Sequence, residues 1–372
     1  MIRHSILTLL FLIFSHTISQ SQPTLKSVLK HNFYIGAALN HEQIIGNDPR
    51  SMEIVEQQFN SITPENVLKW EKVHPAPGVY DFAAADKFVE WGEKNKMFLV
   101  GHTLVWHQQV PRWVFLNESG ATVDGATLLQ RLREHISTVV GRYKDRIHGW
   151  DVVNEAINDQ TGELRRTKWL EILGEDYLLK AFEFAREADP AAELYYNDYS
   201  LCDSVKREGV VRLVKNLQAK GAKVAGIGLQ GHWALDYPSI EELEKSIVTF
   251  AGLGVKVMIT ELDINVLPTD WGNIGADISA NFELQQKYNP YPTALPDSVQ
   301  QRLTKRYQEI FALFQKHQDK ISRVTFWGVT DAHSWLNNWP VRGRTNYPLL
   351  FDREYQPKPA FQAVLDILKQ RR

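Results

Sequence analysis

The hydrophobic residues of this chain fall into short runs that alternate with segments of helical spacing. Runs rich in β-branched and aromatic residues occur at 33–39, 61–64, 97–103, 147–153, 193–197, 224–230, 255–260 and 323–329. Continuous apolar runs of this length are typical of parallel strands that are buried on both faces. The pattern therefore predicts eight strands.

The segments between these runs place apolar side chains three and four residues apart. Leu129, Leu132 and Ile136 show this spacing, which recurs at 210–217 and at 240–250. Such spacing gives a helix one apolar face with which to cover a sheet. These segments are therefore predicted to be amphipathic helices.

Residues at the predicted helix boundaries agree with this alternation. Ser239 followed by Glu242 is the pattern of a capping box, and Gly221 and Gly254 lie where the preceding helices should end. Strand and helix alternate to the end of the chain without a domain linker. The sequence therefore predicts an α/β fold in which residues 22–372 form a single (β/α)₈ barrel, with its active site at the C-terminal ends of the strands.

The first 21 residues are predicted to be a secretory signal peptide. Arg3 precedes an apolar run at 6–14, and small and polar residues follow it around Ser21. The run is too short to span a bilayer, and no later stretch offers the roughly 20 apolar residues that a span needs. We expect a secreted protein, periplasmic or extracellular, whose single cysteine, Cys202, leaves it without an internal disulfide.

The charge pattern argues against a nucleic-acid partner, because 42 Lys and Arg balance 44 Asp and Glu without basic blocks. The 11 Trp and 13 Tyr are more informative, since flat amphipathic rings suit stacking on sugars. The histidines show no spacing typical of metal ligands, so neither a metal nor another cofactor is expected. Nothing in the sequence indicates an obligate protein partner.

Two glutamates follow predicted strands at positions that packing alone would not select. The fourth strand leads into Asn154 and Glu155, and the seventh into Glu261. Strands four and seven lie across the mouth of such a barrel, so the two carboxyl groups could flank a glycosidic bond. One would protonate the leaving oxygen and the other would attack the anomeric carbon, while their mutual repulsion raises the pKa of one. Either glutamate alone fits a structural ion pair equally well, but their joint placement favours catalysis.

Seven motifs, in this order along the chain, together resemble glycoside hydrolase family 10. They are ENVLKW at 65–70, HTLVWH at 102–107, WDVVNEA at 150–156, YYNDY at 195–199, GLQGHW at 228–233, ITELDI at 259–264 and WGVTD at 327–331. The family consists mostly of endo-β-1,4-xylanases. The resemblance therefore implies a retaining enzyme that acts on xylan and xylooligosaccharides, with Glu155 as acid/base and Glu261 as nucleophile.

The resemblance also implies residues that support catalysis. Asn154 resembles the amide that binds the sugar 2-hydroxyl next to the scissile bond. His232 resembles an imidazole that links Glu261 with Asp263, which would orient the nucleophile and help to keep it ionised. A lone histidine is more often a core residue, but the pattern Glu261-x-Asp263 favours the site.

The same motifs imply a set of substrate-binding residues. Those expected around the glycone sugars and the scissile bond are Glu65, Asn66, Lys69, His102, Trp106, Gln109, Gln230, Trp327 and Trp335. Tyr199 is expected to stack on an aglycone sugar. Asp151, Asn197 and Asp331 recur in the motifs too, either as substrate contacts or as residues that hold the top of the barrel together.

Two alternatives and one irregular segment remain at this stage. A retaining β-1,4-glucanase could share the barrel and both glutamates, and a non-catalytic sugar-binding barrel would represent another class, although it should lack a carboxylate. The stretch 267–296 is predicted to be a long loop over the C-terminal face of the barrel.

Overall fold

The computed structural model describes residues 23–269 and 277–369. The predicted signal peptide at 1–21 lies outside the described residues, as does the part of the predicted loop that falls at 270–276. No helix within the described ranges is long and apolar enough to cross a membrane.

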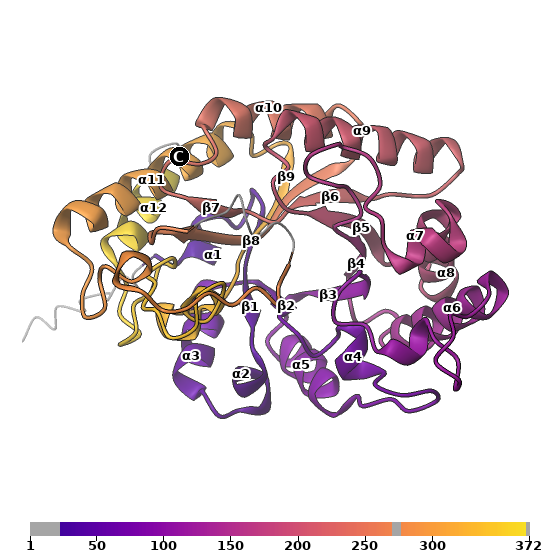
Figure 1. Cartoon of the computed structure of the whole chain (residues 1–372). Helices are drawn as coiled ribbons and strands as arrows, with labels where there is room; N and C mark the ends of the chain where they lie inside the picture. Colours follow the sequence, from indigo (N-terminus) through magenta and orange to yellow (C-terminus); the bar gives the residue numbers. More distant parts are fainter. Residues whose placement is uncertain (1–22, 270–276, 370–372) are drawn as a thin grey trace, which may run out of the picture.

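Eight parallel strands form a closed ring, as the sequence predicts (Figure 1). They are β1 (Tyr34–Leu39), β2 (Ser61–Pro64), β3 (Phe98–Val105), β4 (Gly149–Asn154), β5 (Glu193–Asp198), β6 (Gly226–Leu229), β8 (Lys256–Asn265) and β9 (Ile321–Phe326). Each strand pairs with the next, β6 pairs with β8, and β9 pairs with β1 to close the barrel. A short strand, β7 (His232–Ala234), follows β6 and also pairs with β8.

The expected end of the seventh strand at residue 260 is wrong, because β8 continues to Asn265. The additional residues find a partner in β7, where His232 pairs with Asp263. Earlier in the same strand, Ile259 pairs with Leu229. Between these two pairs, β8 advances by four residues while the segment opposite it advances by three, so β8 contains one extra residue. Such a bulge re-aims neighbouring side chains and is common beside active sites.

Helices surround the ring of strands (Figure 1). They are α1 (Leu25–Val28), α2 (His41–Ile45), α3 (Pro49–Gln58), α4 (Trp70–Val73), α5 (Ala83–Lys94), α6 (Gly125–Arg142), α7 (Lys168–Leu173), α8 (Asp176–Ala188), α9 (Ser204–Ala219), α10 (Ile240–Ala251), α11 (Asp297–Lys316) and α12 (Pro359–Lys369). The three helices predicted from spacing correspond to α6, α9 and α10, and each buries most of its predicted apolar positions, although Leu129 and Ile240 are only half-buried.

Only half of the predicted capping box forms at the start of α10. The Ser239 hydroxyl accepts the backbone N–H of Glu242 at 3.2 Å. The Glu242 carboxylate instead accepts a hydrogen bond from Arg207 of α9 at 2.9 Å. A charged partner on the neighbouring helix therefore replaces the local backbone contact, and it ties α9 to α10.

The irregular segment after β8 contains a single short helical turn, η3 (Gln286–Tyr288), among the residues described there. The N–H of Phe282 donates to the carbonyl of Pro340 at 2.8 Å, so this segment lies beside the loop that follows β9. Two short helical turns in that second loop, η4 (Asp331–His333) and η5 (Trp335–Asn337), lead away from the end of β9.

Candidate active site

Glu155 directly follows β4 and is held by three side-chain donors. The indole N–H of Trp106 reaches Oε2 at 2.8 Å. The amides of Gln230 and Asn154 reach Oε1 at 2.9 and 3.2 Å. Since the side chain is also buried, these contacts fix the direction in which its carboxyl group points.

Glu261 lies at the bulge in β8, and its carboxylate has two side-chain partners, Asn197 of β5 and His232 of β7. The Asn197 amide reaches Oε1 at 2.8 Å, and His232 Nε2 lies 3.0 Å from Oε2. His232 Nδ1 lies 3.1 Å from Oδ2 of Asp263, so the predicted link between the two carboxylates is present. Each ring nitrogen therefore faces a carboxylate oxygen, which requires a proton on both nitrogens and makes the ring an imidazolium.

The electrostatics of this triad agree with its geometry. Burial disfavours the charged form of His232, but the carboxylates of Asp263 and Glu261 outweigh burial and raise its pKa from 6.5 to about 10. Burial also acts to raise the pKa of Glu261. The hydrogen bond from His232, the nearby histidines and Asn197 together outweigh it and hold that pKa below 4.5. Glu261 is consequently ionised at neutral pH, as a nucleophile must be.

Asn197 connects the two glutamates. Its amide N–H₂ group donates to Glu261 and also to Oδ1 of Asn154 at 2.9 Å, and Asn154 in turn donates to Glu155. The hydroxyl of Thr260 donates to the Asn197 oxygen at 2.6 Å. A Cβ atom on Gly228 would lie 2.3 Å from that same oxygen. A glycine at 228 is thus required for Asn197 to occupy this place.

The predicted glycone residues gather beside these carboxylates. Lys69 Nζ donates to Asn66 Oδ1 at 3.2 Å and lies 4.9 Å from the centre of the Trp106 ring. Gln109 Nε2 also reaches Asn66 Oδ1, at 3.4 Å. Burial raises the pKa of Glu65 to about 7, against the opposing effect of Lys69. The cluster therefore offers both donors and acceptors, as binding of sugar hydroxyls requires.

Tryptophan rings enclose the histidines of the site. Trp327 lies between His102 and His232, with ring centres 5.4 and 6.2 Å away. Trp335 packs against His232 at 4.9 Å, and its indole N–H donates to Asp263 Oδ2 at 2.7 Å. Both rings are thus placed on the nucleophile side of the site.

Tyr199 lies beyond β5, on the side of Glu155. Its hydroxyl donates to Asp159 at 2.5 Å and accepts from Arg165 at 2.9 Å. Lys206 Nζ lies 3.3 Å from the centre of the ring and occupies one of its faces. Stacking on an aglycone sugar, which stays a prediction, would have to use the other face.

Several residues have contacts that the sequence could not assign. The motifs predict that Gln230 and Trp106 bind substrate, and in the structure both also donate to the Glu155 carboxyl group. Asp151 accepts a hydrogen bond from His102 at 2.9 Å and so orients a predicted substrate residue. Asp331 is buried against Lys358 at 2.8 Å, which makes it a structural residue of the barrel top.

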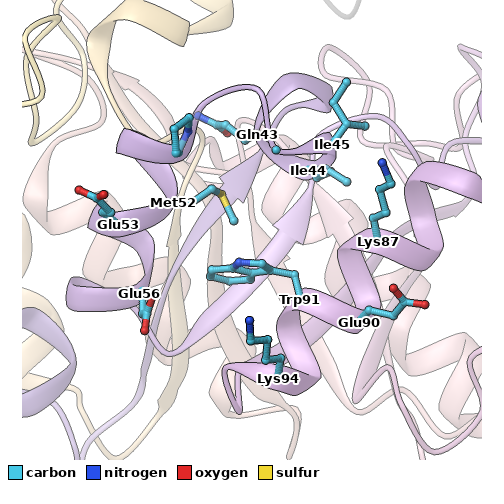
Figure 2. Close-up of a pocket in the computed structure, with 12 residues that line it drawn as sticks. Gln43, Ile44, Ile45, Met52, Glu53, Glu56, Lys87, Glu90, Trp91 and Lys94 are labelled. Atoms are coloured by element: carbon cyan, nitrogen blue, oxygen red, sulfur yellow. The ribbon is translucent and has the colours of Figure 1, made fainter.

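A surface hollow of about 540 Å³ lies away from these residues, between α2, α3 and α5. Figure 2 shows Trp91 on its floor, with Met52 beside it and Glu53, Glu90 and Lys94 around it. None of the predicted site residues lines this hollow. Within the described ranges, no group of His, Cys, Asp or Glu side chains has the arrangement of a metal site.

Glu155 directly follows β4 and Glu261 lies at the bulge in β8, so two buried carboxyl groups meet in one site of a (β/α)₈ barrel. Hydrolysis of a glycosidic bond requires such a pair, and the protein is therefore a glycoside hydrolase. The match to a family model specifies the family of glycoside hydrolases. The model described as glycosyl hydrolase family 10 matches residues 24–367, and the chain belongs to that family.

Relatives of known sequence and structure resemble almost the whole chain. It is 45% identical over 350 residues to endo-1,4-beta-xylanase A of Xylanibacter ruminicola, covering 94% of this chain and 95% of that protein. A GH10 endoxylanase retrieved from a sugarcane soil metagenome has 47% identity and a TM-score of 0.89, covering 92% of this chain and 99% of that one. A mutant protein solved in complex with xylotriose has 38% identity and a TM-score of 0.83, with 92% and 99% coverage.

Proposed function

We propose that this enzyme is an endo-1,4-β-xylanase that hydrolyses internal bonds of xylan with retention of configuration. The observation that carries the proposal is the placement of His232 between Glu261 and Asp263, which keeps one buried glutamate ionised. The names of the relatives support xylan as substrate over the β-1,4-glucanase alternative. The presence of both carboxylates supports catalysis over a purely sugar-binding role.

Each group has a defined part in the proposed double displacement. The Glu261 carboxylate attacks the anomeric carbon while Glu155 transfers its proton to the departing glycosidic oxygen, which leaves a glycosyl ester on Glu261. Glu155, now ionised, takes a proton from water, and the resulting hydroxide displaces Glu261 from the same carbon. Asn154 donates one amide hydrogen to Glu155, which leaves the other for the 2-hydroxyl of the sugar.

Azide rescue of two alanine variants tests both assignments. Glu155→Ala should nearly abolish xylan hydrolysis but still form the glycosyl-enzyme from dinitrophenyl xylobioside, because that leaving group barely needs a proton. Azide needs no deprotonation, so it should restore turnover and release a β-glycosyl azide. Glu261→Ala forms no covalent intermediate, and azide should give the α-azide instead. An α-azide from Glu155→Ala would show that the roles are reversed.

We also propose that the enzyme is exported from the cytoplasm. The basic residue Arg3 and the apolar run at 6–14 support this, and the family match begins only at residue 24. N-terminal sequencing of protein recovered outside the cells should find a chain that begins close to residue 22. An intact N-terminus on protein retained in the cytoplasm would contradict export.

A further inference from the structure

The backbone of Glu155 adopts a conformation that is unfavourable for any residue other than glycine. Its φ angle is +59°, in the left-handed region that non-glycine residues rarely occupy. Such a conformation is unfavourable for a residue with a Cβ atom, so it persists only where surrounding contacts impose it. The direction of the Glu155 side chain depends on this conformation, because the backbone sets where its Cα–Cβ bond points.

Hydrogen bonds hold the peptide groups on both sides of Glu155. Its N–H donates to the carbonyl of Asn197 at 2.9 Å. Its carbonyl accepts from Arg165 Nε at 3.1 Å. The next N–H, of Ala156, donates to the Tyr196 hydroxyl at 3.0 Å. Of these three contacts, the one from Arg165 comes from a loop rather than from the neighbouring strand β5.

Three acceptors surround Nη2 of the Arg165 guanidinium. Nη2 donates to the carbonyl of Ile157 at 3.0 Å and to the hydroxyl of Tyr199 at 2.9 Å, and it pairs with Asp159 at 3.3 Å. The side chain is only 14% exposed. Because a guanidinium is planar and its donors diverge at fixed angles, these acceptors determine where Nε points.

We propose that Arg165 is a positioning residue for the acid/base, acting through the main chain of Glu155 and not through its carboxyl group. By holding the carbonyl of Glu155, it maintains the left-handed conformation from which the carboxyl group reaches the glycosidic oxygen. The same guanidinium also donates to the hydroxyl of Tyr199, the residue expected to contact the aglycone sugar. Arg165 therefore positions both Tyr199 and the backbone of Glu155. The inference rests on the proposed role of Glu155.

A leaving-group series distinguishes this role from general support of the fold. The rate constant kcat/KM for aryl xylobiosides reports the first displacement, in which poor leaving groups need proton donation and dinitrophenolate scarcely does. Arg165→Met should lower kcat/KM roughly 10- to 100-fold for poor leaving groups, as misplacement of a reacting group does. The value for the dinitrophenyl substrate should change less than about twofold. The matched control is Arg166→Met, since Arg166 is the adjacent arginine and is exposed; its values should equal those of the wild type.

Arg165→Lys provides a second variant that keeps the positive charge beside Asp159 but lacks the planar set of donors. We expect it to show the same dependence on the leaving group. Equal losses for all substrates, or failure of both variants to fold, would assign Arg165 to general support of the fold, and no loss would show that Glu155 does not depend on it. Each of these results would overturn the inference. Glu155→Ala measured in parallel separates the two hypotheses: if it lacks the leaving-group dependence, the proposed function fails, and if it alone shows the dependence, only the role of Arg165 fails.

Discussion

Replacement of His232 by glutamine should move the acid limb of the pH–rate profile. A pKa of about 10 in place of 6.5 corresponds to roughly 5 kcal/mol in favour of the imidazolium, at about 1.4 kcal/mol for each tenfold change in proton affinity. Glutamine is uncharged, so Glu261 and Asp263 would face each other in a buried site without a cation between them. The pKa of Glu261, now held below 4.5, should rise.

The assay is kcat/KM for a soluble aryl xylobioside between pH 3 and 8, because this ratio reports ionisations of the free enzyme. The wild-type acid limb should lie below pH 4.5, and that of His232→Gln should lie at a higher pH. His317→Gln is the matched control, since His317 binds Glu244 on the outer helices and its loss should leave the limb unchanged. An acid limb of His232→Gln at the wild-type pH would refute the role assigned to the imidazolium.

The same substitution should change how stability depends on pH. His232 binds its proton more tightly in the folded than in the unfolded state, so its stabilisation is complete below pH 6.5 and is lost as the pH rises toward about 10. The free energy of unfolding, measured with urea, should therefore be lower at pH 9 than at pH 7 for the wild type, and His232→Gln should lack this decrease. Equal decreases in both proteins would contradict this linkage.

Two further substitutions test specificity and packing. Trp335→Ala should raise the ratio of activity on soluble cellulose to activity on xylan, because xylose lacks the hydroxymethyl group that this ring would exclude; an unchanged ratio would place the discrimination elsewhere. Trp91→Ala, in the outer hollow, should leave the ratio unchanged. Gly228→Ala places a methyl group against Asn197 and should lower both kcat and the unfolding free energy, the latter by about 1–3 kcal/mol. Gly141→Ala, where a Cβ meets nothing within 4 Å, should lower neither.

The strand order could be predicted because the strands fall in runs rich in β-branched and aromatic residues and the helices between them show helical spacing. The extension of β8 could not, because its partner β7 is a three-residue strand whose own sequence carries no such run. The Glu242 half of the predicted capping box is absent for a related reason. Arg207 competes for Glu242 from another helix, and local spacing contains no information about that residue.

The two glutamates could be predicted because strand ends in a barrel define a common edge. The partners of these glutamates depend on tertiary structure. Asn197 and Glu261 are 64 residues apart, and Gln230 and Glu155 are 75 apart. A motif identifies Gln230 as a residue of the site, but whether its amide faces a sugar or a carboxylate depends on distances that appear only once the strands are paired.

Closure of the ring by β1 and β9 has a consequence for synthesis of the enzyme. The partners of the Glu155 carboxyl group come from β3, β4 and β6 or the residues that follow them, whereas the indoles that enclose His232 follow β9, the last strand. A nascent chain that ends before residue 321 contains both glutamates but neither Trp327 nor Trp335, and β1 has no partner along its second edge. Activity should thus appear only when the final part of the chain has left the ribosome. Its recovery during refolding would measure the pairing of the first strand with the last, and not the earlier collapse of the core.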